Sequence, residues 1–408
     1  MRDIPEEKYI VAAVFGEKEN HEWLDELEEL VRTQGGAVVG RVTQNREHTH
    51  PATYFGRGKL AELKEKIEET GATGVVCDDE LSAAQYGNMT DFLGVKVVDR
   101  TVVILDIFAK NANSAESIVQ TELAQLNYRK SRLSGLGKSL SRQGGGIGTR
   151  GPGETKLESD RRHIQTRIEH LNTELVGIAA NRRVLREGRE RNKMPVISLV
   201  GYTNAGKSTI LNMLTNAGVA ARDELFATLT TTSRAVELPL GAAAILTDTV
   251  GFIRKLPHQI IKAFSATIEE LGYADILLHV IDISSKDAAE QAETVYKTLR
   301  TLGIDKPVIE VYNKIDVAAN ANFADSGAAA RVRISAKTGQ GKDALLNAVE
   351  TELRKLKTEI DIVIPYTNGQ FLHLIHEKGD IISEEFLSEG TRIHAFVPPE
   401  LAKNSLPE

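Results

Sequence analysis

The stretch Gly201-Tyr-Thr-Asn-Ala-Gly-Lys-Ser208 matches the pattern GxxxxGK[ST] of a phosphate-binding loop. An apolar segment typical of a buried strand, Val196–Val200, precedes it, and a helical segment, Ser208–Leu214, follows it. In this context backbone N–H groups and a helix N-terminus bind phosphate oxygens, whereas an ordinary glycine-rich turn rarely has the whole pattern. The residues expected to contact the phosphates are Gly201, Tyr202, Thr203, Asn204, Ala205, Gly206, Lys207, Ser208 and Thr209.

Three further motifs follow in the order that a GTP site requires. They are Asp248-Thr-Val-Gly251, Asn313-Lys-Ile-Asp316 and Ser335-Ala-Lys337, and the first two come directly after apolar strand-like segments. Each is common alone, where a plain turn or a chance tripeptide explains it. All four motifs in this order predict a guanine-nucleotide hydrolase.

The last two motifs are expected to bind the base. A carboxylate at Asp316 can accept from both N1–H and the exocyclic amine of guanine, a donor pair that adenine lacks. The Ala336 N–H is expected to meet guanine O6. The predicted base-binding residues are Asn313, Lys314, Asp316, Ser335, Ala336 and Lys337.

Mg²⁺ is expected between the Ser208 hydroxyl and the Asp248 carboxylate. The segment Phe226–Arg234 offers several hydroxyls for another metal contact, with Thr228 the first choice and Thr232 the reserve; a polar loop explains any single threonine equally well. The residues assigned to catalysis are Lys207, Thr228 and Gly251, and Phe226 is assigned to nucleotide binding.

Two positions bear on the rate of hydrolysis. Many GTPases follow the DxxG motif with a glutamine that orients the attacking water, and here that position is Phe252. Hydrolysis is therefore expected to be slow until a partner completes the site, unless other groups position the water. Asn204 stands where some related GTPases hold a K⁺ ion, and stabilisation of the loop backbone is an equal alternative.

The composition indicates a soluble, cytoplasmic protein of several domains. The chain has 408 residues and one cysteine, Cys77, so it cannot form an internal disulfide. It contains no apolar run of spanning length, and its first residues are polar and acidic rather than signal-like. A net charge of −7 argues against general nucleic-acid binding, DNA included.

The pattern of apolar segments predicts a multidomain α/β chain. Alternating strand and helix patterns over residues 1–110 indicate a small parallel α/β domain, and residues 111–193 indicate a helical hairpin. Residues 194–357 form the predicted GTPase domain, with a doubly wound, mostly parallel sheet. Residues 358–408 indicate a small α+β domain without a recognisable chemical motif.

The hairpin has an unusual tip and an unusual charge. A helix is predicted over 114–130, a glycine-rich loop over 134–153 and a second helix over 154–191. Residues 127–193 have more than twice as many Lys and Arg as Asp and Glu, although charge pairs along a solvated helix explain part of this excess. RNA is the favoured ligand of the loop, a protein the alternative, and the residues expected to contact RNA are Lys138, Arg142 and Arg150.

Over nearly its whole length the chain resembles the HflX family of ribosome-associated GTPases. The resemblance rests on Pro51–Lys59, on Val98-Asp-Arg-Thr101 and, most specifically, on Gly144–Glu158. It implies binding to the large (50S) ribosomal subunit and its rRNA, ribosome-stimulated hydrolysis and GTP-dependent splitting of stalled or idle 70S ribosomes. Some members are also described as binding ATP through the N-terminal domain, but residues 1–190 contain no Walker motif.

Two other classes of function stay open on the residues alone. One is an RNA-binding chaperone or remodeller in which the nucleotide only gates affinity, and the other is a signalling GTPase with a protein partner. Nothing in the sequence indicates a dimer interface, so a monomer is expected.

Overall fold

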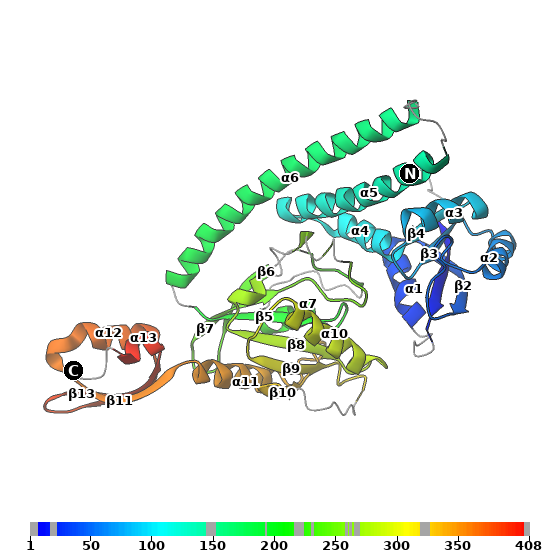
Figure 1. Cartoon of the computed structure of the whole chain (residues 1–408). Coiled ribbons are helices and arrows are strands. Elements are labelled where there is room, and N and C mark those ends of the chain that lie inside the picture. Colours follow the sequence, from blue (N-terminus) through cyan, green and yellow to red (C-terminus); the bar gives the residue numbers. More distant parts are fainter. Residues whose placement is uncertain are drawn as a thin grey trace, which may run out of the picture. The chain divides into compact units, whose positions relative to one another are not determined.

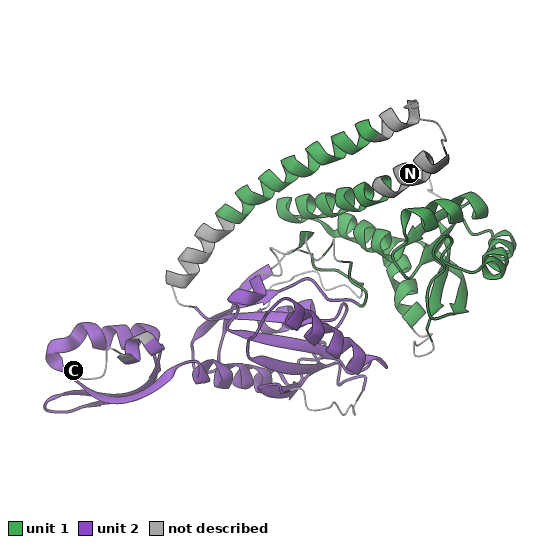
Figure 2. Cartoon of the chain, viewed as in Figure 1, with its two compact units in different colours: residues 1–182, 222–230, 254–266 green, residues 183–221, 231–253, 267–408 purple. Residues whose placement is uncertain are grey.

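The structure is a computed structural model. It describes the backbone of residues 7–16, 23–143, 152–191, 194–215, 224–229, 232–257, 260, 263–264, 270–318 and 327–403, and their side chains except those of 134–143, 152–157, 181–191, 400 and 403. The chain divides into two compact units (Figure 2). The first unit comprises residues 1–182, 222–230 and 254–266, and the second comprises 183–221, 231–253 and 267–408.

The first unit is built on a parallel sheet with the strand order β2-β1-β3-β4. Its strands are β1 (Lys8–Phe15), β2 (Ala37–Asn45), β3 (Gly74–Cys77) and β4 (Lys96–Asp99). Helices α2 (Arg57–Thr70) and α3 (Ala83–Leu93) share a core with Ile10, Ala12 and Val14 of β1. Because the alternate residues of β1 are also buried, both faces of the central strand are covered, which confirms the predicted small parallel sheet.

Helices α1 (Trp23–Gln34) and α4 (Arg100–Asn111) pack against each other in the same unit (Figure 1). Helix α4 is not predicted from the sequence. Its residues are apolar over most of their length, and the side chains of Val103, Ile104, Leu105, Ile107 and Phe108 are all buried. A helix buried on most sides lacks the alternation of polar and apolar residues that marks a surface helix.

The predicted hairpin is present, but its first helix is longer than expected. Helix α5 runs over Ala115–Gln143 and α6 over Pro152–Arg191 (Figure 1). Val119, Leu123, Ile168 and Leu171 pack between them. The prediction of a loop from 134 is therefore wrong for its first ten residues. Leucines at 133, 136 and 140 continue the helical spacing, and glycine lowers helix propensity by only about 1 kcal/mol relative to alanine.

The second unit contains a six-stranded sheet with the order β10-β9-β8-β5-β7-β6, in which only β6 is antiparallel to its neighbour. The strands are β5 (Val196–Gly201), β6 (Thr232–Glu237), β7 (Ala243–Asp248), β8 (Ile276–Asp282), β9 (Val308–Asn313) and β10 (Ala330–Arg333). The helices that follow its strands include α7 (Lys207–Thr215), α10 (Ala288–Thr301) and α11 (Lys342–Lys355). This confirms the doubly wound, mostly parallel sheet. Strand β8 starts later than the expected residue 272, because Glu270–Tyr273 forms a 3₁₀ turn, η1.

The same unit ends in a three-stranded antiparallel sheet with the order β11-β13-β12. Strands β11 (Thr358–Pro365), β12 (Asp380–Phe386) and β13 (Gly390–Val397) join with the turn η2 (Tyr366–Asn368) and with helices α12 (Gly369–Lys378) and α13 (Pro399–Lys403). Ile364, Ile375, Ile393 and Val397 are among the residues of their common core. The α+β pattern predicted for this end of the chain is confirmed.

Candidate nucleotide site

The phosphate-binding motif forms the turn between β5 and α7. Gly201 and Gly206 have φ angles of 156° and 99°, and Asn204 has a φ of 60°, so the backbone turns through conformations that favour glycine. A Cβ atom on Gly201 would lie 2.4 Å from the Val280 carbonyl oxygen. The loop is thus a narrow, backbone-lined turn at the carboxyl edge of the sheet, where open α/β sheets bind ligands.

Lys207 lies inside this turn and is buried. Its Nζ donates to the carbonyl oxygens of Gly201 at 3.1 Å and Tyr202 at 2.7 Å. Burial lowers the pKa of Lys207 to about 8, and the nearby Asp248 carboxylate opposes this shift only in part. An anionic ligand at the turn would favour the charged lysine and so raise this pKa again.

The DxxG motif lies against the same turn. A Cβ on Gly251 would be 3.0 Å from Lys207 Nζ and 2.9 Å from the Thr203 methyl group, so only a glycine leaves this space open. The next residue, Phe252, is 4 % exposed and is bonded on both sides: its N–H donates to the Gly201 carbonyl oxygen and its carbonyl oxygen accepts from the Thr203 N–H. Its phenyl ring offers no hydrogen bond to a water molecule.

Ser208 and Asp248 present adjacent oxygen atoms. The Ser208 hydroxyl donates to Asp248 Oδ2 at 2.7 Å, and the carboxylate, at the end of β7, is fully buried. A hydroxyl and a carboxylate beside a phosphate-binding turn are the oxygen ligands that Mg²⁺ prefers. These two residues therefore fit a magnesium ion.

Asn313 connects the phosphate end of the site to the base end. Its Nδ2 donates to the Ala205 carbonyl oxygen at 2.9 Å, and its Oδ1 accepts from the Ala336 N–H at 3.0 Å. From the sequence, Asn313 is expected to bind only the base, and its bond to the phosphate-binding turn is not predicted. Because the Ala336 N–H already donates to Asn313, the contact expected between Ala336 and guanine O6 would have to share this donor.

Asp316 is exposed at the other end of the site. A hydrogen bond from the Ser335 side chain lowers the pKa of Asp316, and Lys337 and Lys314 act in the same direction. Lys314 has a φ of 67° and forms an ion pair with Asp282 at 2.7 Å. The arrangement presents an ionised carboxylate that can accept from two donors of a ligand.

Thr232 is the first residue of β6, where it pairs with Asp248 of the site. Phe226 and Thr228 belong to the first unit, whereas the motifs belong to the second. The metal role of a threonine therefore stays a prediction. Arg150 and the side chains of Lys138 and Arg142 lie outside the described residues.

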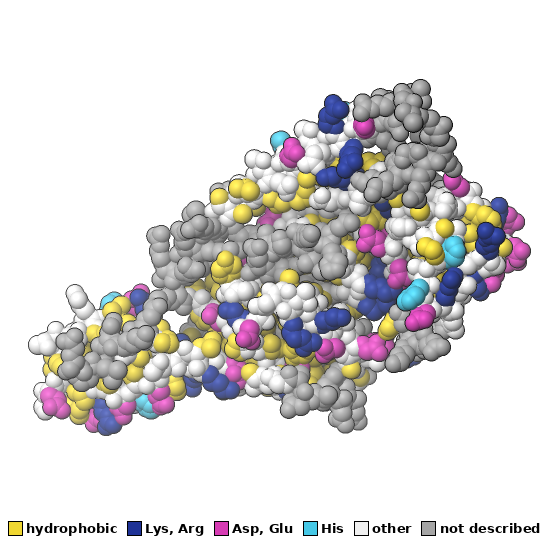
Figure 3. Space-filling model, viewed as in Figure 1, with side chains coloured by type: hydrophobic (Ala, Val, Ile, Leu, Met, Phe, Trp, Pro, Cys, Tyr) yellow, Lys and Arg dark blue, Asp and Glu magenta, His cyan; other side chains and the backbone are white. Residues whose placement is uncertain are grey.

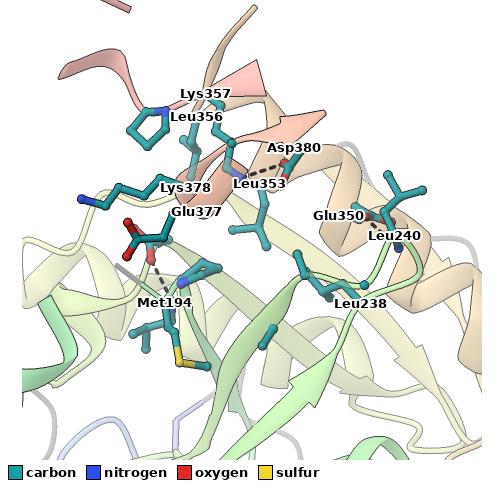
Figure 4. Close-up of a pocket in the computed structure, with 18 of the residues that line it drawn as sticks. Met194, Leu238, Leu240, Glu350, Leu353, Leu356, Lys357, Glu377, Lys378 and Asp380 are labelled. Carbon is teal, nitrogen blue, oxygen red and sulfur yellow. Dashed lines mark hydrogen bonds and ion pairs between the residues drawn. The ribbon is translucent and has the colours of Figure 1, made fainter. Parts of the chain in front are cut away.

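A cavity of about 890 Å³ lies in the second unit away from all four motifs (Figure 4). Met194, Leu238 and Leu353 contribute apolar surface to it, and the Lys357–Asp380 ion pair lies in its wall. Its lining includes Pro195 and Val196, where β5 begins, whereas the motifs follow the ends of β5, β7 and β9. The cavity is thus no part of the nucleotide site.

Acidic and basic side chains are interspersed on the face shown in Figure 3. Among the residues that the structure describes, no helix is both long enough and apolar enough to cross a membrane.

Comparison with known proteins identifies the family. Three family models match in succession: the GTP-binding GTPase N-terminal model over residues 21–109, the GTP-binding GTPase middle region over 111–189 and the 50S ribosome-binding GTPase over 196–314. The GTPase HflX of Lacrimispora saccharolytica is 52 % identical over 404 residues, which cover 98 % of this chain and 96 % of that protein. The GTPase HflX of Escherichia coli is 38 % identical over 95 % of this chain and 92 % of that protein.

A crystal structure of a protein called SsGBP with GDP is 26 % identical and covers 84 % of this chain and 98 % of that one, with a TM-score of 0.46. Identity with curated relatives over nearly the full length, together with the three family models, confirms the resemblance seen in the sequence. The protein is a GTPase and belongs to the HflX family.

Proposed function

We propose that this GTPase binds the large (50S) ribosomal subunit, that the ribosome stimulates its hydrolysis of GTP, and that its GTP form splits stalled or idle 70S ribosomes. The proposal rests on the apolar side chain of Phe252. This apolar residue, bonded to the phosphate-binding turn, occupies the position from which a glutamine would orient the attacking water. An external partner that orders the water would supply what the site lacks.

The site residues take the roles that their positions support. Lys207 and the N–H groups of the turn at 201–206 hold the phosphates, Gly251 meets the γ-phosphate, and Asp316 reads the base. Ser208 and Asp248 hold Mg²⁺, which would neutralise charge that develops between the β and γ phosphates. Thr228 is proposed as a further magnesium contact.

The hairpin is proposed as the part that reaches rRNA. Its excess of Lys and Arg suits a polyanion, and Arg150 belongs to its glycine-rich segment. We expect Arg150→Ala to leave intrinsic turnover unchanged and to reduce the ribosome-dependent part. Equal loss of both would contradict the proposal, because the loop would then serve the active site.

The experiment measures GTP turnover by the purified protein alone and with 50S subunits, and follows 70S dissociation by light scattering with a non-hydrolysable GTP analogue. Strong stimulation together with dissociation supports the proposal. Stimulation without dissociation would favour a nucleotide-gated RNA remodeller, and the lack of both, with nucleotide binding intact, would favour a protein-partnered GTPase. Turnover in K⁺ compared with Na⁺ tests the ion role considered for Asn204.

A further inference from the structure

An acidic pair lies at the carboxyl edge of the sheet of the first unit. Asp78 and Asp79 follow β3, and β1 is paired with β3 on one side and with β2 on the other. The chain therefore leaves β1 and β3 in opposite directions, which makes this edge the point where α/β sheets commonly bind ligands. In this protein, other side chains of the chain contact the acidic pair at this edge.

Arg254 and Lys255 contact this acidic pair. Arg254 Nη2 lies 3.2 Å and Lys255 Nζ 2.8 Å from Asp78 Oδ2, and Lys255 Nζ also lies 2.5 Å from Asp79 Oδ1. Asp78 is 1 % exposed. Burial alone would raise the pKa of Asp78, but Arg100, Lys255 and Arg254 hold it below its ordinary value.

Residues from two stretches that mark the family resemblance contact the same acidic pair. The Tyr54 hydroxyl, from Pro51–Lys59, donates to Asp79 Oδ2 at 2.7 Å. The Arg100 guanidinium, from Val98–Thr101, donates to Asp78 Oδ1 at 2.9 Å and also pairs with Glu26. Three carboxylates thus meet three cations, and two of the cations come from residues that directly follow the DxxG region.

A second contact, also within the first unit, joins Phe226 to α4. Phe226 is buried, its ring centroid lies 4.8 Å from that of Phe108, and Phe108 also packs on Phe264 at 5.0 Å. The Asn111 Nδ2 donates to the Phe226 carbonyl oxygen at 3.0 Å. We call residues 224–229 and 254–257 the switch segments, because the first contains Thr228 and the second follows Gly251.

The backbone of the switch segments fits an anchoring role. Phe226 and Lys255 have φ angles of 55° and 54°, in the left-handed region that residues with a side chain seldom adopt. Such conformations persist where surrounding contacts fix them. In each switch segment, the residue with the unusual backbone is also the one held by α4 or by the acidic pair.

From these contacts we propose that α4 and the Asp78–Asp79 pair sense which nucleotide is bound. The proposal rests on the roles proposed above for Thr228 at the magnesium ion and for Gly251 at the γ-phosphate. A rearrangement of the switch segments when GTP replaces GDP would alter the ion pairs and the aromatic contacts in the first unit. By reciprocity, a change in the first unit alters the preference of the site for GTP over GDP.

Trp23 offers a direct readout. It is the only tryptophan of the chain, and the Arg254 guanidinium carbon lies 4.2 Å from its ring centroid. We expect the Trp23 emission to differ between the protein saturated with GDP and with a non-hydrolysable GTP analogue, and Lys207→Ala to show no such difference. Identical emission in both states, with both nucleotides bound, would overturn the proposal.

A double-mutant cycle tests the acidic pair. Asp79→Asn and Lys255→Ala each remove one side of the same contact, so each is expected to change the ratio of GTP to GDP affinity by about fivefold or more. The double variant should change the ratio no more than the larger single change. Wild-type ratios in both single variants, or strictly additive effects, would contradict the proposal.

Arg167→Gln is the matched control. It removes an exposed ion pair with Glu122 in the same unit, and should leave the ratio of affinities unchanged. Circular dichroism confirms that each variant is folded, and Lys255→Gln serves if Lys255→Ala is not. These assays contain no ribosomes, so a negative result would contradict the nucleotide-sensing proposal and leave the proposed ribosomal function unaffected. Conversely, a lack of ribosomal stimulation would leave the nucleotide-sensing proposal unaffected.

Discussion

Lys207 is the residue whose charge decides how tightly phosphates are held. Because burial lowers its pKa to about 8 in the ligand-free protein, part of the population is neutral just above neutral pH. Nucleotide phosphates bind the charged form, so affinity should fall as pH rises through this value. Between about pH 7 and pH 8.5 we expect a roughly fourfold loss of GTP affinity, which follows from the fraction of charged lysine.

Titration calorimetry at several pH values checks this expectation. Lys207→Arg is the control, because a guanidinium stays charged throughout this range, and whatever affinity the variant keeps should not vary with pH. A flat profile for the unaltered protein would mean that the phosphates meet a lysine that never loses its proton.

Asp316 decides which base is accepted. Its carboxylate can only accept, which suits the two donors of guanine, whereas an asparagine would offer both a donor and an acceptor. We expect Asp316→Asn to weaken GTP binding about 100-fold or more and to improve binding of xanthosine triphosphate. Competition binding with both nucleotides measures the change, with the exposed Asp343→Asn as control, and unchanged selectivity would exclude Asp316 from base recognition.

Among the elements, the turn between β5 and α7 depends on the end of β9. A Cβ on Gly206 would lie 2.2 Å from Asn313 Nδ2, the atom that bonds the turn. Gly206→Ala should therefore displace Asn313 and abolish tight nucleotide binding. Gly303→Ala separates this clash from backbone strain, because Gly303 also has a positive φ, of 67°, but nothing within 4 Å of its Cβ position.

For Gly303→Ala we expect a loss of about 1 kcal/mol in the free energy of unfolding, the cost of a left-handed alanine, with normal nucleotide affinity. Fluorescent GDP binding and urea unfolding measure the two effects. Normal binding by Gly206→Ala would show that the turn does not need its bond to Asn313.

Most strands of the parallel and the mostly parallel sheet, but not all of the helices, can be predicted from the sequence. Apolar runs bounded by turns predict β1, β5, β7 and β9, and the motifs that follow β5, β7 and β9 meet at one edge because parallel strands end together. The helix α4 is missed because apolar residues cover most of its surface, and the end of α5 is missed because its glycines suggest a loop.

The contacts between motifs could not be predicted in the same way. Asn313 bonds Ala205 and Ala336 across more than 20 residues of sequence in either direction, and no local pattern encodes such a pairing. Phe226 and Lys255 adopt left-handed backbone conformations, which a sequence pattern predicts only where the residue is a glycine. Their partners on α4 and at Asp78 become visible only when the first unit is folded.

For the whole molecule, the division into two units raises the question of whether they unfold independently. Trp23 belongs to the first unit, whereas Lys207, Asp248 and Asn313 belong to the second. Nucleotide at about 100 times its dissociation constant should stabilise the folded second unit by about 2.7 kcal/mol. If the switch segments couple the two units, part of this gain should also appear in the first.

Urea unfolding followed by Trp23 emission tests this coupling, because the signal reports only the first unit. We expect its midpoint to rise when GDP is added, and the rise to shrink in Asp79→Asn, which weakens the contact with Lys255. Lys207→Ala supplies the baseline without bound nucleotide. The opposite outcome is an unfolding midpoint, followed by Trp23 emission, that does not change with nucleotide while circular dichroism shows that the second unit is stabilised. It would mean that the two units unfold independently and that the contacts of Arg254 and Lys255 only stabilise the packing of the first unit.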